Sequence, residues 1–288
     1  MLFVLASCSS DDDKASAAGD GSFVEFSLDG ESVDITKRNT DFIANENCDR
    51  IYATISHISD DQTLRFRMEF ELTGTGHIDN IRFVEYSDNN RNYNTVNFQP
   101  AETFSINNFS YDAATKQLYF DFDGDLYDID DQGQKTHISG KFQYNSANSV
   151  ECGFFQRHVT ADNGSMHFTR WVVNTSADWV LYQFYSDNGY LMRIYSDTDI
   201  KNVSPGTYDL ASGDNVRIEL YKYIGETKAT PLQPLYSNEW EFYDCTGTIT
   251  VNSQNLQPFP HTTGTFSFQA TDANGNIIFE NLSGTFEM

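Results

Sequence analysis

Apolar and polar residues alternate along much of the chain, most clearly between residues 64 and 72. Five apolar side chains alternate there with four charged ones, in the order Leu64, Arg65, Phe66, Arg67, Met68, Glu69, Phe70, Glu71 and Leu72. A period of two predicts a β-strand with one buried and one exposed face, because a helix would scatter the same apolar residues around its circumference. Burying five such side chains contributes roughly 8–15 kcal/mol gross.

The same pattern recurs from residue 22 to the C-terminus. Strands are expected at residues 22–28, 51–58, 64–72, 81–86, 104–109, 118–122 and 137–144, and then at 150–155, 166–174, 179–185, 190–195, 207–210, 216–223, 239–251, 264–270 and 277–286. Turn dipeptides such as Asp29-Gly30, Asn188-Gly189 and Asn274-Gly275 separate several of them, which is typical of β-hairpins. No convincing amphipathic helix pattern is present, so the sequence predicts an all-β fold.

Composition and loop positions refine this prediction. Aromatic residues make up 15% of the 288 residues, and they favour pleated, half-buried surfaces. Many short strands with regular turns predict an antiparallel β-sandwich, and this length suits two such domains. We expect a disordered N-terminal tether (1–21), β-sandwich domain 1 (22–148) and β-sandwich domain 2 (149–288). The polar loop 145–149 lies at the boundary between the two domains.

The two halves look weakly alike, in two competing registers. One register aligns Phe109-Ser110-Tyr111 with Phe266-Ser267-Phe268, and the other aligns Gly140-Lys141-Phe142 with Gly264-Thr265-Phe266. A tandem duplication and a shared hairpin chemistry are both compatible with this likeness.

The N-terminus carries a candidate lipid attachment site. The run Leu5-Ala6-Ser7-Cys8 resembles a bacterial lipobox, in which the cysteine is acylated. Only seven residues precede Cys8 and none is basic, whereas a signal peptide begins with a basic segment and an apolar stretch, so we expect the natural start to lie upstream. The acidic run Asp11-Asp12-Asp13 resembles the export signal of Bacteroidota surface lipoproteins; the alternative is a solvated charge run.

The second half strengthens that resemblance. Its recurring motifs are Gly206-Thr207-Tyr208, Gly247-Thr248-Ile249-Thr250, Gly264-Thr265-Phe266-Ser267-Phe268 and Gly284-Thr285-Phe286. Residues 166–288 resemble uncharacterised β-sandwich domains of Bacteroidota lipoproteins. The resemblance implies a protein anchored to the outer membrane by palmitate and other acyl chains on Cys8, facing the cell surface, with residues 9–21 as a flexible leash. It implies no catalytic residues.

Net charge and cysteine content limit the possible binding partners and the possible disulfide bonds. A formal net charge of −24 argues against a nucleic acid partner, because phosphates must be met by Lys and Arg, and it allows cation binding. Cys48, Cys152 and Cys245 allow one disulfide bond, whose pairing the sequence leaves open.

Acidic residues between 121 and 131 form the candidate metal site. Asp121, Asp123, Asp125 and Asp128 offer the oxygen ligands that Ca²⁺ prefers, although the glycine and glutamate positions of an EF-hand loop are not matched. The alternative is a strand whose exposed face is acidic, since alternation places Asp121 and Asp123 opposite Phe120 and Phe122. No other cofactor is expected.

Aromatic residues between 171 and 195 form the candidate ligand site. Trp171, Trp179 and Tyr182 could stack on the sugar rings of a glycan, and the alternative is a strand buried on both faces.

The sequence lacks a nucleophile elbow, a phosphate-binding loop and a metalloprotease motif. Glu239 and Glu241 share one strand face, whereas a glycosidase places its two carboxylates on either side of a sugar. We therefore expect no enzymatic activity and predict a cell-envelope lipoprotein that serves as a binding or structural module. The alternatives are a glycan-binding accessory protein of a polysaccharide-uptake system and a glycosidase-like enzyme, and a protein partner also stays open.

Overall fold

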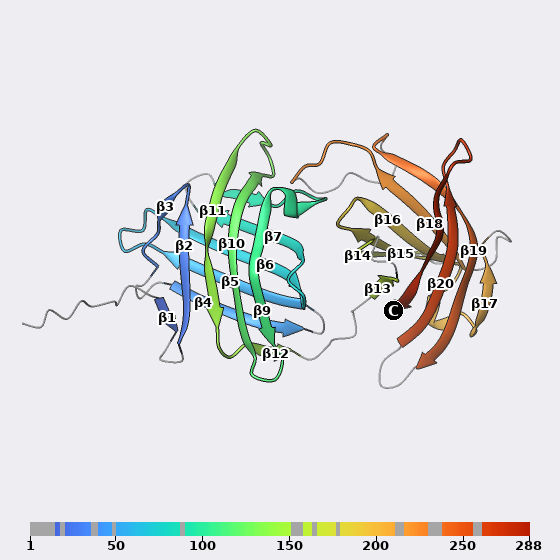
Figure 1. Cartoon of the computed structure of the whole chain (residues 1–288), viewed down its shortest axis with the longest axis horizontal. Coiled ribbons are helices and arrows are strands. Elements are labelled where there is room, and N and C mark those ends of the chain that lie inside the picture. Colours follow the sequence, from blue (N-terminus) through green and yellow to red (C-terminus); the bar gives the residue numbers. More distant parts are fainter. Residues whose placement is uncertain are drawn as a thin grey trace, which may run out of the picture.

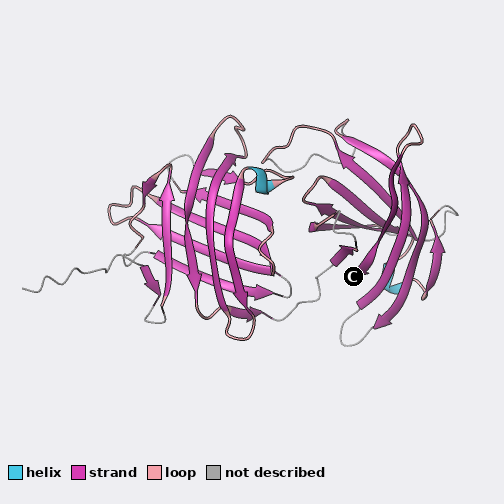
Figure 2. Ribbon diagram, viewed as in Figure 1, coloured by secondary structure: helices cyan, strands magenta, loops and turns pink. Residues whose placement is uncertain are grey.

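The computed structural model describes residues 15–17, 21–35, 40–47, 50–86, 90–150, 158–162, 166–176, 179–210, 216–229, 238–255 and 261–288. Within these ranges the chain forms two sheets and two short 3₁₀ turns, η1 (Pro100–Glu102) and η2 (Ile200–Asn202) (Figure 2). The prediction of an all-β, sandwich-like fold is confirmed.

The first sheet contains the strands up to residue 150. They are β1 (Ala15–Ala17), β2 (Ser22–Leu28), β3 (Glu31–Ser32), β4 (Thr40–Asn47), β5 (Arg50–Ile58), β6 (Arg65–Thr73), β7 (Ile78–Glu85), β8 (Arg91–Asn94), β9 (Phe104–Asp112), β10 (Gln117–Asp128), β11 (Lys135–Tyr144) and β12 (Asn148–Val150). The strand order is β1-β2-β11-β10-β8-β7-β6-β5-β4-β12, with β3 on β2 and β9 on β10. The sheet curls, so that β2, β11, β10 and β9 cross in front of β4 to β7 (Figure 1).

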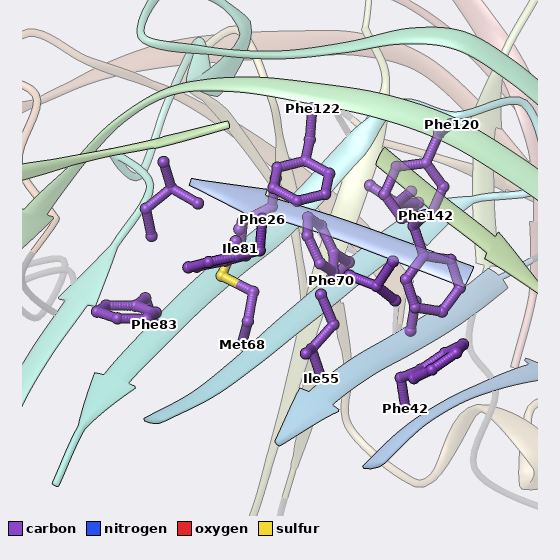
Figure 3. Close-up of a cluster of buried hydrophobic side chains, with 14 of the residues drawn as sticks. Phe26, Phe42, Ile55, Met68, Phe70, Ile81, Phe83, Phe120, Phe122 and Phe142 are labelled. Atoms are coloured by element: carbon purple, nitrogen blue, oxygen red, sulfur yellow. The ribbon is translucent and has the colours of Figure 1, made fainter. Parts of the chain in front are cut away.

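The space between these two layers holds the first hydrophobic core. Alternation buries Leu118, Phe120 and Phe122 of β10 on the inner face. Figure 3 shows Phe120 and Phe122 directed toward Phe70 of β6, whose ring centroid lies 5.1 and 5.0 Å from theirs. The run of residues 64–72 that predicted a half-buried strand supplies Phe66, Met68, Phe70 and Leu72 to this core, all at most 1% exposed.

The second sheet contains the strands from residue 158 onward. They are β13 (His158–Ala161), β14 (Phe168–Thr175), β15 (Val180–Ser186), β16 (Tyr190–Ser196), β17 (Gly206–Asp209), β18 (Val216–Tyr223), β19 (Trp240–Asn255), β20 (His261–Thr271) and β21 (Ile277–Glu287). Their order is β13-β21-β20-β19-β18-β16-β15-β14, with β17 on β19. The strand β19 belongs to both layers, because residues 240–243 pair with β18 and residues 244–255 pair with β20. The second core lies between those layers.

The β10–β11 and β20–β21 hairpins have the same register. Phe122 pairs with Gly140 in the first half, and Phe266 pairs with Gly284 in the second. The matching segments are therefore Gly140-Lys141-Phe142 and Gly284-Thr285-Phe286. Neither register considered from the sequence is this one.

Part of the predicted N-terminal leash is a strand. Residues 9–21 were expected to be unstructured, but Ala15–Ala17 forms β1, antiparallel to residues 22–24 of β2. Main-chain hydrogen bonds to a sheet edge do not require apolar side chains, so composition alone did not indicate this strand. Cys8 and the acidic run Asp11-Asp12-Asp13 lie outside the described residues.

Candidate functional site

The two halves meet through a short segment that follows β8. Its central residue, Phe98, is only 3% exposed, although it projects from a loop. Its ring centroid lies 5.0 Å from that of Tyr223 and 6.1 Å from that of Trp240, both in the second half. An aromatic side chain of the first half is therefore buried by aromatic side chains of the second.

Main-chain hydrogen bonds hold the same segment in place. The N–H of Asn97 donates to the carbonyl of Lys228 at 2.8 Å, and the N–H of Gln99 donates to the carbonyl of Asp187 at 2.6 Å. Gln99 adopts a left-handed conformation, with φ of 52°. The strands β7 and β14 are also in contact, so the interface extends beyond this segment.

A cavity of about 430 Å³ lies at this interface. Its lining comes from both halves: Arg50, Glu71, Asp79, Asn80, Asn94, Thr95, Val96, Asn97, Phe98, Trp171, Tyr185, Ser186 and Ala229. Small-molecule sites of this size occur preferentially at domain interfaces, with a few polar groups converging on an apolar wall. We take this inter-half cavity as the candidate functional site.

Charged groups of the cavity come from strand ends of the first sheet. Arg50 opens β5, and its Nη1 donates to Oδ2 of Asp79 near the start of β7. The Asp79 side chain is 3% exposed, so this ion pair is largely desolvated. Glu71 of β6 is the cross-strand neighbour of Asn80.

Amide side chains add neutral hydrogen-bonding capacity. Asn80, Asn94 and Asn97 all line the cavity. Oδ1 of Asn94 is buried and accepts no hydrogen bond from the part of the chain that the structure describes. Buried polar atoms normally have a hydrogen-bond partner, so the lack of one at this oxygen is unusual.

The three predicted ligand-binding aromatics do not come together. Trp171 lines the cavity and packs partly on the second core. Tyr182 is 3% exposed within that core and donates its hydroxyl to Asp199 at 3.0 Å. Trp179 precedes β15, at the opposite end of that strand from the cavity residue Tyr185, and its ring centroid lies 6.2 Å from that of Tyr195.

The four predicted metal ligands are engaged with neighbouring side chains and main-chain groups. Asp121 accepts from the Tyr119 hydroxyl and the Asn108 amide, both at 2.5 Å, and these bonds lower its pKa. Asp125 pairs with Lys135 at 2.5 Å and with His137 at 3.0 Å, and Lys135 is the main cause of its lowered pKa.

The remaining two carboxylates behave similarly. Asp123 is exposed and lies 3.4 Å from Nε2 of His137. Asp128 accepts the main-chain N–H groups of Asp130 and Asp131, which closes a turn. Within the described ranges no group of three or more His, Cys, Asp or Glu side chains could hold a metal ion. The arrangement favours the alternative interpretation of an acidic exposed strand face.

Of the cysteines, only Cys245 lies in the described residues, and its thiol is free. Burial raises the pKa of Cys245 to about 12, so the thiol is uncharged and unreactive at neutral pH. Two of the three possible disulfide pairings require Cys245. Cys48 and Cys152 lie outside the described residues.

Glu239 and Glu241, the carboxylates singled out from the sequence, do not line the cavity. Glu241 accepts a hydrogen bond from the Tyr243 hydroxyl at 3.1 Å. Sequence reasoning missed Glu71, Asp79, Asn80 and Asn94, because polar residues on strand faces and at strand ends are ordinarily solvated.

A comparison of the chain with protein-family models, curated proteins and solved structures finds no match. Across the described ranges, no helix has the length and apolar character needed to span a membrane.

Proposed function

We propose that this chain is a non-enzymatic binding module of the cell envelope, held to the outer membrane by acyl chains on Cys8 and facing the cell surface. Its ligand binds in the inter-half cavity. The observation that carries the proposal is the cavity itself, which both halves build and which combines an aromatic wall with a desolvated ion pair and amides. Such a combination of aromatic and polar groups suits a ligand that binds reversibly in one orientation.

The side chains at the cavity favour binding over catalysis. Among the described residues lining it there is no histidine to act as a base at neutral pH. Ser186, its serine, donates its hydroxyl toward Asn188 at 2.7 Å, and not to a base that would activate it. Asp79 already pairs with Arg50.

Mass spectrometry of the protein isolated from its own envelope tests both parts of the proposal. Denaturing spectra should show acyl chains on the N-terminal peptide that contains Cys8, absent in Cys8→Ala and retained in the control Ser10→Ala.

Native spectra should show a retained small molecule. Asn80→Trp, which fills the cavity, should lose that molecule, and the exposed control Asn107→Trp on β9 should keep it. Unmodified Cys8, or a retained molecule that Asn80→Trp does not affect, would contradict the proposal.

A further inference from the structure

The chemistry of the cavity wall specifies a class of ligand. We infer, on the basis of the proposed function, that the inter-half cavity binds a short oligosaccharide that carries no acidic groups. The inference depends on three properties of the described residues: an aromatic face, planar polar groups and the balance of charge.

The aromatic face comes from Trp171. Its side chain is half-buried, because it packs partly on the second core and also lines the cavity. The pairing of Trp171 with Phe184 in the β14–β15 ladder fixes its position along the sheet. The π face of an indole is negatively polarised and attracts the C–H groups of a sugar ring. A half-buried tryptophan in the wall therefore offers a sugar ring an aromatic contact at one side of the cavity.

The planar polar groups come mainly from the first half. Each amide of Asn80, Asn94 and Asn97 carries donors and an acceptor in one plane, which matches adjacent sugar hydroxyls that both donate and accept. These three amides all line the cavity, so they offer hydrogen-bonding groups to a ligand rich in hydroxyls. An apolar ligand could not use this capacity, which is a source of discrimination.

The charge balance argues against acidic ligands. The cavity contains two carboxylates, Glu71 and Asp79, and one guanidinium, which already pairs with Asp79. The whole chain carries a formal charge of −24. An anionic ligand would meet repulsion both at the site and on approach. A cavity of about 430 Å³ is at the lower end of the range for small-molecule sites, so the ligand is short.

Titration calorimetry of the full chain tests the ligand class. The panel contains cellotriose, maltotriose, xylotriose and mannotriose as uncharged probes, with trigalacturonic acid and the glucosamine trimer as anionic and cationic counterparts. At least one uncharged or cationic trisaccharide should bind, more tightly than the anionic one. Binding of trigalacturonic acid alone, or of none of the panel, would overturn the inference. If none binds but Asn80→Trp still removes a retained molecule, the ligand class fails while the binding function stands.

Variants locate the site. Trp171→Ala should weaken binding at least tenfold, and Trp179→Ala, at the far end of β15, should change it less than twofold. Asn80→Leu should also weaken binding at least tenfold without lowering the melting temperature, because it replaces an amide that lines the cavity with an apolar side chain of similar size. Equal effects of Trp171→Ala and Trp179→Ala, or loss of binding in Asn80→Leu only together with loss of the melting transition, would contradict the assignment.

Discussion

His57 is the clearest case in which burial sets the protonation of one residue. It is 3% exposed, its Nδ1 lies 2.7 Å from the hydroxyl oxygen of Thr40, and its ring packs against Phe66. Desolvation is the main cause that lowers the pKa of His57, and the carboxylates of Asp34 and Asp60 only partly oppose it. The folded protein therefore holds this imidazole neutral at pH 7.

This burial predicts a stability that falls on mild acidification. An unfolded chain protonates His57 near the ordinary pKa of about 6.5, whereas the folded chain resists protonation until a lower pH. The unfolded state then binds more protons, so the His57 contribution is complete above pH ~6.5 and is lost as the pH falls toward the folded pKa. Urea unfolding between pH 7.5 and 5.5 measures the slope. His57→Gln should flatten it, and an identical slope in that variant would rule out His57 as its source.

At the scale of elements, the two equivalent hairpins share an unusual packing device. A Cβ atom at Gly140 would lie 2.0 Å from the carbonyl oxygen of Glu25 and 2.6 Å from the Phe122 ring, and one at Gly284 would lie 2.0 Å from the carbonyl oxygen of Thr160 and 2.6 Å from the Phe266 ring. A Cβ atom at Gly264 would likewise lie 2.1 Å from the Phe286 ring and 2.2 Å from the carbonyl oxygen of Thr250, so the packing recurs within these hairpins and does not decide between a duplication and a shared hairpin chemistry.

Alanine at either glycine should therefore destabilise its own half. The added methyl group must displace a main-chain carbonyl, and we expect Gly140→Ala and Gly284→Ala each to lower the free energy of unfolding by about 1–3 kcal/mol. Gly133→Ala is the control, because its nearest contact would be the Asp131 carboxylate at 3.3 Å, and it should change stability by less than about 0.5 kcal/mol. Urea denaturation gives these values. Three equal effects would refute the packing argument.

Sequence patterns predicted those elements in which one face is apolar. The alternation at residues 64–72 identified β6, and that at residues 118–122 identified the middle of β10. The strand β4 was missed because its buried face contributes only Phe42 and Ala44, and most of its other residues are polar. The alignment of one hairpin with the other depends on contacts between residues distant in sequence. Local patterns therefore could not decide between the two registers considered.

The candidate site was predicted only where one residue was conspicuous by itself. Trp171 was singled out as one of the aromatic residues between 171 and 195 that could stack on a sugar ring, and it lines the cavity. Asp79 and Asn94 carry no such signal. They face the second half only because residues 95–99 dock there, and that docking cannot be read from local periodicity.

At the scale of the whole molecule, the pairing of Ala15–Ala17 with β2 limits how far the body can lie from its proposed anchor. Six residues, 9–14, separate Cys8 from β1. The seven residue steps from Cys8 to Ala15, at about 3.3–3.6 Å each, span at most roughly 25 Å. An acylated Cys8 would therefore keep the first half close to the membrane, and the second half would be the one presented farther out.

Whether the two halves act as one body depends on Phe98. Its burial between Tyr223 and Trp240 joins the halves by side-chain packing, and the hydrogen bonds of Asn97 and Gln99 flank it. Replacing a buried Phe by Ala costs about 3–5 kcal/mol, and here that cost falls on docking and not on either core. We expect Phe98→Ala to increase the radius of gyration in small-angle X-ray scattering and to separate one melting transition into two.

The control Phe98→Leu, which keeps an apolar side chain, should retain most of the docking. Because the cavity wall takes residues from both halves, Phe98→Ala should also release the retained ligand, although neither core is altered. An unchanged radius of gyration together with a single transition would mean that the other contacts between the halves hold them without the ring of Phe98. These contacts include the hydrogen bond from the Ala229 N–H to Gln132 Oε1 and the ring contact of His77 with His167. The cavity would then be a fixed site. Separation of the halves would instead make ligand binding and docking thermodynamically coupled, since a molecule bound by both halves must stabilise their contact.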